Sequence, residues 1–452
     1  MSFMEASFPI GTGGCKMKSF RSENSSVRVL SGVIGLILAN QSIAEDRWSG
    51  FQNAGRLIVS DLPDAWDAQG KNVAWKAELM GYGQSTPVVF GDHVYVTSTS
   101  GPNKENCHVT AYALLDGSKR WQKDFQNPSP EPSNNYVSRA APTPVVDSQG
   151  LVVSFEGGLL IGLTFDGNLR WEKNLVDLYG PIKARHGLAS SLEHDSDQVY
   201  VWVEREQDPY ILALNKASGD VVWKSTGVGA TSWSSPRLLT VAGKPQLLCS
   251  SSGKIAGYDT RTGSKLWEFT DIANNTTCTP IPVADGKFLI GASDGRGEQS
   301  SGKTAASNGL IEIKPSGEGK FNVDYVWRAE KATCSFGSPI VAAEKVWIVN
   351  RTGVLYQLDL ATGNQISAER ISAGSVWATP LATQDKLYLF GQKGTTSIVE
   401  LATAKEIATC STWEDAEQAP AAAMGGPVLY AALSVNNTLL IRRGDLLVAI
   451  RQ

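Results

Sequence analysis

The sequence predicts an all-β fold: a β-propeller of eight four-stranded antiparallel blades, with seven blades as the alternative count. Three observations predict this fold. A unit of four short strands recurs along the chain, and its copies start 41 to 59 residues apart. A spare strand near the start of the chain matches one that the last copy lacks.

The first half of the repeat is a small or polar run that ends in proline, followed by an apolar strand, a turn and a second strand. Residues 85–96, 337–349 and 378–389 are clear copies, each with an aromatic residue eight positions after the proline. The third and eighth copies lack the proline, which is why seven blades remain the alternative. The anchor positions are Pro87, Pro144, Ser191, Pro236, Pro280, Pro339, Pro380 and Ala432.

The second half is a third strand, a turn and a fourth strand that ends in tryptophan. Residues 213–223 and 257–267 are the fullest copies. The Asp or Asn that opens the turn can cap it, and the glycine takes the positive φ that closes it. Residues 357–367 keep this turn but have Ser367 where tryptophan is expected.

The ends of the repeat region predict how the ring closes. Residues 72–76 form a strand around Trp75 before the first anchor, whereas the last repeat stops after its third strand at 445–450. The early strand can therefore supply the missing outer strand of the last blade, which leaves no open sheet edge.

Residues 1–44 have the features of a secretory signal peptide, with Met17 as a candidate true start. A basic segment precedes an apolar stretch at 29–39, and Ser42 and Ala44 are small residues at the positions that signal peptidase reads. The stretch is too short to span a bilayer stably, and an uncleaved anchor is the alternative.

We therefore predict three parts: a signal peptide at 1–44, an N-terminal lead-in at 45–71 and the propeller at 72–452. The expected location is the periplasm or the exterior, without a transmembrane anchor. The formal net charge of −4 and the lack of a basic stripe give no support to nucleic-acid binding.

Few residues point to catalysis. The four histidines have no zinc-binding spacing, and no G-x-S-x-G is present. Six cysteines are scattered without a CxxC motif, and five remain after the signal peptide. Their number is then odd, so disulfides cannot pair them all, and buried thiols are the other interpretation.

The turn and final tryptophan of the repeat resemble the tryptophan-docking motif of the quinoprotein (pyrroloquinoline quinone, PQQ) repeat family. The resemblance covers roughly residues 72–450 and implies a fold like that of quinoprotein alcohol dehydrogenase. In that family the tryptophan packs against the neighbouring blade. The resemblance implies this role for Trp75, Trp121, Trp171, Trp223, Trp267 and Trp327.

The family has an enzymatic branch and a non-catalytic, BamB-like branch. The dehydrogenases stack PQQ on a ring formed by two adjacent disulfide-bonded cysteines, hold Ca²⁺ with acidic and amide side chains and use an Asp base. This chain has no Cys-Cys pair and no CxxCH, and no acidic or amide residue can be matched to those roles. The resemblance therefore favours the non-catalytic branch, without a cofactor. BamB-like lipoproteins have a cysteine at the mature N-terminus, whereas Glu45 follows Ala44 in this chain.

The long segments of the repeat predict which face binds a partner. Turns alternate between the two faces of an antiparallel blade, and the long segments at 123–140, 173–189, 293–308 and 409–430 all fall on the same face. Insertions on one face of a rigid scaffold usually mark the functional face, and simple decoration of a tolerant rim is the alternative. Residues that enter the innermost strands there could surround a funnel, although packing between blades would also explain them. They are Gln84, Arg139, His186, Trp233, Phe336 and Trp377.

The sequence thus favours an exported, monomeric, non-catalytic propeller that binds a protein, peptide or glycan through this face. A PQQ-dependent oxidoreductase with an atypical site and Ca²⁺ is the first alternative. A sugar-active enzyme with paired carboxylates is the second, and no pair of carboxylates identifies itself for that role.

Overall fold

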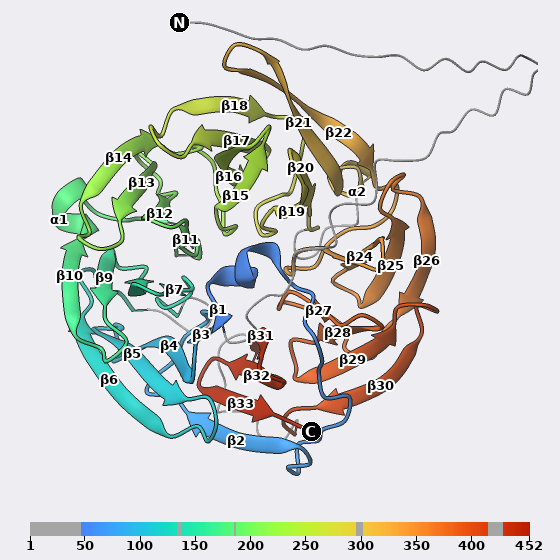
Figure 1. The fold of residues 1–452 in the computed structure, drawn as a ribbon, viewed down its shortest axis with the longest axis horizontal. Helices are drawn as coiled ribbons and strands as arrows, with labels where there is room; N and C mark the ends of the chain where they lie inside the picture. Colours follow the sequence, from blue (N-terminus) through green and yellow to red (C-terminus); the bar gives the residue numbers. More distant parts are fainter. Residues whose placement is uncertain (1–46, 133–137, 185–186, 295–301, 415–427) are drawn as a thin grey trace, which may run out of the picture. The chain divides into compact units, whose positions relative to one another are not determined.

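The computed structural model describes residues 47–132, 138–184, 187–294, 302–414 and 428–452. In these ranges, eight sheets are arranged as the blades of a ring (Figure 1). The predicted eight-bladed propeller is confirmed. The predicted signal peptide lies outside the described residues. None of the helices in the described ranges has the length and apolar character needed to cross a membrane.

Each blade has four antiparallel strands that follow one another from the centre to the rim. Blade 1 contains β3 (Val88–Phe90), β4 (His93–Ser100), β5 (Asn106–Ala113) and β6 (Lys119–Gln126). Blade 2 contains β7 (Val145–Asp147), β8 (Gly150–Ser154), β9 (Leu159–Leu163) and β10 (Leu169–Asn174). Blade 3 contains β11 (Glu193–His194), β12 (Gln198–Val203), β13 (Tyr210–Asn215) and β14 (Val221–Thr226). Blade 4 contains β15 (Arg237–Val241), β16 (Lys244–Ser251), β17 (Lys254–Asp259) and β18 (Lys265–Phe269). Blade 5 contains β19 (Ile281–Ala284), β20 (Lys287–Ile290), β21 (Gly309–Gly317) and β22 (Lys320–Arg328). Blade 6 contains β23 (Ile340–Ala342), β24 (Lys345–Val349), β25 (Val354–Asp359) and β26 (Gln365–Arg370). Blade 7 contains β27 (Leu381–Ala382), β28 (Lys386–Phe390), β29 (Thr395–Glu400) and β30 (Glu406–Ser411). Blade 8 contains β31 (Leu429–Val435), β32 (Thr438–Arg443), β33 (Leu446–Ile450) and β2 (Val73–Glu78).

Burial follows the position of a strand in its blade. Middle strands such as β9 are buried at every residue, because neighbouring blades cover both of their faces. Rim strands such as β22 alternate between exposed and less exposed residues, because only one face packs inward. The short helices α1 (Leu175–Tyr179) and α2 (Gly302–Ala305) lie in connections of what we call the long-loop face. That face carries the connections between blades and the turns between second and third strands. The other two kinds of turn form the short-turn face.

The ring closes as predicted. Strand β2 pairs antiparallel with β33, with Val73 opposite Ile450 and Glu78 opposite Leu446. The buried Arg442 of blade 8 also reaches blade 1, where it donates to the carbonyl oxygens of Ser85 at 2.7 Å and Thr97 at 2.6 Å. The first and last segments of the propeller are therefore held side by side.

A ring of hydroxyl groups joins the inner ends of the blades. In five successive junctions, the backbone N–H of the residue before the anchor donates to the hydroxyl of its equivalent in the next blade, at 2.9 to 3.0 Å. We call these residues the hydroxyl belt: Thr86, Thr143, Ser191, Ser235, Thr279 and Ser338. A buried N–H must find a partner, and no strand ladder reaches these groups. The belt also corrects one anchor. Ser191 aligns with Thr143, so the third anchor is Leu192 and not Ser191.

Five of the six docking tryptophans form a hydrogen bond to the next blade. Their indole N–H groups donate to a backbone carbonyl at 2.8 to 3.0 Å: Trp75 to Leu114, Trp121 to Phe165, Trp171 to Lys216, Trp223 to Thr260 and Trp327 to Leu360. Trp267 differs, because its N–H donates to Gln246 of its own blade at 2.7 Å. The long β21–β22 hairpin replaces the usual turn in blade 5, so Trp267 does not form the same contact there.

Gly219 shows why the turn needs glycine when a tryptophan packs on it. Its φ of +74° is unfavourable for other residues, and a Cβ there would lie 2.5 Å from the Trp171 ring. Blade 7 has Ala404 at the same position with φ of 60°, and blade 6 offers Ser367 in place of a tryptophan. The side chain at this position is therefore tolerated where no indole ring occupies the space.

The lead-in occupies the centre of the ring (Figure 1). Strand β1 (Arg47–Trp48) extends blade 1 inward, and the turn η1 (Phe51–Gly55) follows it. The Gln52 amide donates to the hydroxyls of Ser338 at 3.0 Å and Thr379 at 2.7 Å, and its oxygen accepts from Arg237 at 3.0 Å. Gln52 therefore continues the hydroxyl belt from blade 6 to blade 7.

The lead-in then runs along blade 7 toward the rim. It forms a parallel bridge between Ile58 and Ala382, and Asp64 pairs with Lys386 at 3.1 Å. The buried Trp66 donates from its indole N–H to the hydroxyl of Thr412 at 3.2 Å. This contact supports blade 7, because the preceding blade 6 has Ser367 where a docking tryptophan is expected.

We expect Gly219→Ala to lower the free energy of unfolding by about 2–4 kcal/mol, since it adds backbone strain and displaces the Trp171 ring. Ala404→Gly is the matched control and should change stability by less than about 1 kcal/mol, because relief of the positive φ of Ala404 offsets the loss of its buried methyl group. Guanidinium unfolding measures both. Equal effects of the two substitutions would contradict the role given to the indole ring.

We expect Gln52→Ala to lower the free energy of unfolding by about 2–4 kcal/mol, because it removes three buried hydrogen bonds, those of the Gln52 side chain with Ser338, Thr379 and Arg237. Gln69→Ala is the control. Its amide donates to Glu414 at 2.7 Å at an exposed site, so the change should stay within about 0.5 kcal/mol. A loss of similar size in both variants would show that Gln52 does not join the blades.

Candidate binding site

A cavity of 210 Å³ opens at the centre of the long-loop face. Its lining follows a simple register: in an extended chain alternate residues point the same way, so the third and first residues before an anchor face the axis together. The lining residues three positions before an anchor are Gln84, Ala141, Ala189, Trp233, Thr277, Phe336 and Trp377. Those one position before an anchor are Thr86, Thr143, Ser191 and Ser235. Phe51, Glu156 and Tyr430 complete it.

The structure brings together four of the six side chains predicted for this face, namely Gln84, Trp233, Phe336 and Trp377. Arg139 is not among the lining residues. It lies five residues before its anchor, and its guanidinium pairs with Glu131 at 2.5 Å. Ala141 has the equivalent place in the lining of blade 2, and Arg139 stays a predicted residue of the long-loop face. His186 lies outside the described residues.

One wall of the cavity is aromatic. The ring centres of Phe336 and Trp377 are 4.6 Å apart, and those of Trp377 and Tyr430 are 6.1 Å apart. The Tyr430 hydroxyl lies 3.1 Å from that of Tyr82, which fixes the end of the row. These rings come from blades 6 to 8. They offer a flat apolar surface on which a ring or a long side chain can stack.

The other wall is small and polar. Blades 1 to 3 contribute Gln84, Thr143 and Ser191, and the alanines of blades 2 and 3 leave space between them. Phe51 of the lead-in also lines the cavity, and a smaller space of 50 Å³ contains both Phe51 and Gln52. The lead-in therefore occupies the ring on the short-turn side of the cavity, and a ligand would approach from the long-loop face.

Glu156 is the carboxylate in this lining. It follows β8 and accepts hydrogen bonds from the backbone N–H groups of Ala141 and Leu188, both at 3.2 Å. Burial raises the pKa of Glu156 to about 7, although the Arg139 charge and these N–H groups oppose the rise. The polar wall therefore changes charge near neutral pH.

A second cavity of 420 Å³ lies on the same face and includes Trp233 in its lining, so one indole borders both cavities. Glu204 lines it and repeats the arrangement of Glu156. It accepts from the indole N–H of Trp202 at 2.6 Å and from the backbone N–H groups of Gly229 at 2.6 Å and Ala230 at 3.0 Å. Burial raises the pKa of Glu204 as well, against these hydrogen bonds.

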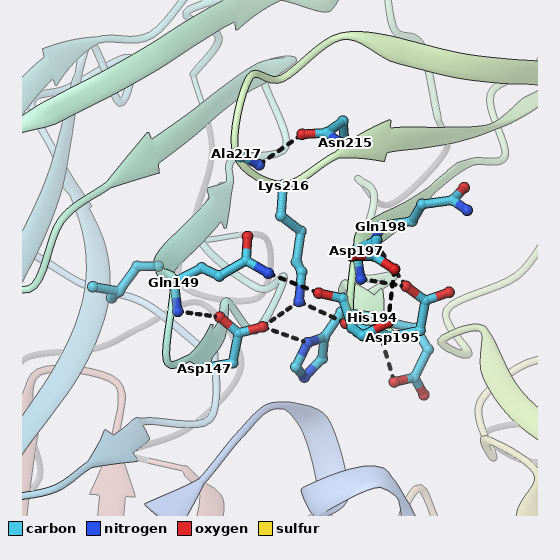
Figure 2. Close-up of polar contacts among 12 residues, drawn as sticks. Asp147, Gln149, His194, Asp195, Asp197, Gln198, Asn215, Lys216 and Ala217 are labelled. Atoms are coloured by element: carbon cyan, nitrogen blue, oxygen red, sulfur yellow. Dashed lines mark hydrogen bonds and ion pairs between the residues drawn. The ribbon is translucent and has the colours of Figure 1, made fainter.

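A buried charged cluster lies on the short-turn face. Figure 2 shows the Lys216 ammonium between Asp147 of blade 2 and the turn after His194. Lys216 also donates to the backbone oxygen of Asp195 at 2.6 Å. Burial alone would raise the pKa of Asp147, but the His194 ring, whose Nδ1 lies 3.6 Å from the carboxylate, and the Lys216 ammonium outweigh it and hold the pKa well below its usual range. The cluster joins blades 2 and 3, and no pattern in the sequence predicted it.

Among the described residues, the lining of the central cavity does not offer the groups that the dehydrogenase branch implies for PQQ and Ca²⁺. Glu156 is the one carboxylate of that described lining, which includes no aspartate and no cysteine. Within the described residues, no group of three or more His, Cys, Asp or Glu side chains could hold a metal ion, and the five cysteines there are free thiols.

Ten of the fourteen lining residues were not predicted from the sequence. Seven of them follow the register of the anchors, whereas Phe51, Glu156 and Tyr430 lie outside it. Tyr430 was hidden because β31 has a bulge between Leu429 and Ala431, which shifts the register before the eighth anchor. Phe51 belongs to the lead-in, whose path across the ring no repeat pattern describes. Glu156 and Glu204 both stand just past the second strand of their blades, at the same distance from the anchors Pro144 and Leu192, so this shared position was the available signal.

The eight four-stranded blades define the class of protein as an eight-bladed β-propeller. A family model described as outer membrane protein assembly factor BamB matches residues 38–179 and 181–369. The chain therefore belongs to this BamB-like family of propellers. BamB from Shewanella oneidensis is 23% identical over 305 residues, which cover 66% of this chain and 66% of the relative. The aligned region thus spans just under two thirds of that relative.

Solved structures show the same fold. BamB from Moraxella catarrhalis has a TM-score of 0.55 at 16% identity and covers 84% of this chain and 99% of its own. Quinohemoprotein alcohol dehydrogenase from Comamonas testosteroni has a TM-score of 0.56 at 13% identity and covers 89% and 80%. The computationally designed Ika8 protein reaches 0.51 at 9% identity and covers 83% and 100%. An assembly factor, an enzyme and a design share the fold, so the fold alone decides no activity.

We expect the buried Glu156 to make stability depend on pH. Its pKa is higher in the folded than in the unfolded state, so its contribution is fully present below about pH 4.5 and is lost as pH rises to about 7. Across this window the free energy of unfolding of the wild type should fall by about 3 kcal/mol relative to Glu156→Gln. Urea unfolding at several pH values measures the difference. A difference that stays constant with pH would contradict the assignment.

Proposed function

We propose that this protein is an exported, non-catalytic scaffold that binds a protein partner through its long-loop face. The observation that carries the proposal is the pair of cavities, of 210 Å³ and 420 Å³, that share Trp233 on this face. A polypeptide can place one side chain in the central cavity and continue across Trp233 into the second.

The size and chemistry of the cavities support a polypeptide. The central cavity is smaller than the pockets of about 300–1,000 Å³ that enclose drug-sized ligands, so it suits one side chain. Its aromatic wall can stack a flat or aliphatic group, and Glu156 opposite offers an acceptor. Buried Trp and Tyr side chains in such pockets often dominate binding energy between proteins.

The family supports the same function and location. Its model and the Shewanella relative are described as outer membrane protein assembly factors. The predicted signal peptide at 1–44 agrees with an exported protein in the periplasm or outside the cell, where we propose that it acts as a monomer. We propose no cofactor, because the lining residues that the structure describes include no cysteine and no aspartate to hold PQQ with Ca²⁺.

The face that binds can be tested by photocrosslinking in the envelope of the source cell. We expect a photoreactive phenylalanine at Phe336 to form discrete protein adducts, and Trp377→Ala to reduce their yield at least tenfold. The control is the same group at Arg261, on the short-turn face, whose side chain is 80% exposed. Adducts that form only from Arg261 would contradict the proposed face, and adducts with carbohydrate would replace the protein partner with a glycan.

The enzymatic alternative has its own test. The purified protein is titrated with PQQ and Ca²⁺ while visible absorbance and dye reduction by alcohols or sugars are followed. We expect no saturable change in absorbance and no turnover. Saturable binding with turnover would replace the scaffold function by that of a PQQ-dependent oxidoreductase.

A further inference from the structure

Two cysteine thiols lie close together beside Gly291 of blade 5. Cys278 precedes its first strand β19, and Cys334 follows its last strand β22. Both side chains are almost completely buried. A Cβ at Gly291 would lie 2.7 Å from the sulfur of Cys278 and 2.6 Å from that of Cys334. The two sulfurs can therefore be no farther apart than the sum of these distances.

The surrounding backbone holds the two cysteines in place. The backbone N–H of Cys334 donates to the carbonyl oxygen of Ala292 at 2.9 Å, and the Cys278 thiol lies 3.6 Å from the carbonyl oxygen of Gly337. Gly291 follows β20 directly, and its missing side chain leaves the space that both sulfurs occupy. The two cysteines thus share one small site between blades 5 and 6.

We propose that Cys278 and Cys334 form a disulfide bond that closes blade 5 when the protein folds in an oxidising compartment. The bond would join the start and the end of one complete blade. The other described cysteines, Cys107, Cys249 and Cys410, remain free thiols.

The reaction is thiol–disulfide exchange with a small-molecule or protein disulfide as the oxidant. The thiolate of one cysteine attacks the oxidant and releases a thiol, and the second thiolate then attacks the mixed disulfide and releases another. Two electrons pass to the oxidant, and the two protons leave with the released thiols. Two thiols become one disulfide, and one external disulfide becomes two thiols.

The order of events follows from burial. The neighbouring Cys278 sulfur and burial raise the pKa of Cys334, so little reactive thiolate is present once the blade has packed. The external disulfide must therefore reach the pair before blades 5 and 6 close. Protein that has folded in the reduced form should react slowly, whereas protein that folds with the oxidant present should be cross-linked.

Blade 5 also has a structural reason to need such a bond. The Trp267 indole of blade 4 donates to Gln246 of its own blade, so blade 5 lacks the carbonyl contact that five other junctions have. A bond between the two ends of the blade would restrict its unfolded ensemble and compensate for this loss. Thr277 and Phe336, close to the two cysteines in sequence, line the central cavity, so the bond would also hold part of the binding site.

The test is to refold the full-length chain with reduced and oxidised glutathione and, in parallel, with reductant. We expect two fewer free thiols in the oxidised sample and a cross-linked peptide containing Cys278 and Cys334, lighter by two hydrogen atoms. The unfolding midpoint should rise by several degrees and return when reductant is added.

The variants Cys278→Ala and Cys334→Ala should each remove the cross-link, whereas Cys107→Ala and Cys249→Ala should keep it. Peptide mapping of the wild-type chain needs no variant, so a folding defect in a variant leaves the test intact. A full set of free thiols after oxidative refolding, or pairing of Cys278 with any other cysteine, would overturn the proposal.

Discussion

The ring depends on how buried backbone N–H groups at its centre find partners. In blades 1 to 5, the residue before the anchor precedes the first strand of its blade, so no neighbouring strand accepts from its N–H. The hydroxyl of the next blade does so instead, from Thr86 through Ser338. Each blade therefore specifies the position of the next, and an unpaired N–H at any of these places would cost free energy.

The repeat is weakest between blades 6 and 8, and there the chain uses segments from outside the repeat. Gln52 continues the belt to Thr379, and Trp66 packs on blade 7, whose neighbour has Ser367 in place of a docking tryptophan. The lead-in is thus part of the propeller core. It also supplies Phe51 to the central cavity, which links the stability of the ring to the shape of the binding site.

The same register separates folding from function. The hydroxyl residues beside the anchors carry the belt, so the residues two positions earlier are free to vary. They are alanines in blades 2 and 3 and aromatic in blades 4, 6 and 7, which produces one polar and one aromatic wall. The carboxylates of the two cavities come from the turns after second strands. There Glu156 and Glu204 accept hydrogen bonds from backbone N–H groups of the connection to the next blade.

The sequence by itself determined the fold, because strand periodicity, turn glycines and tryptophans repeat locally at each blade. It also placed β2 beside β33, since a missing strand and a spare strand can be counted. It located Trp233, Phe336 and Trp377 at the axis through their fixed distance from the anchors. Only the tertiary structure decided that Arg139 pairs with Glu131, that Phe51 lines the cavity and that Cys278 lies close to Cys334. These contacts join residues far apart in the chain through connections that follow no repeat, so no local pattern encodes them.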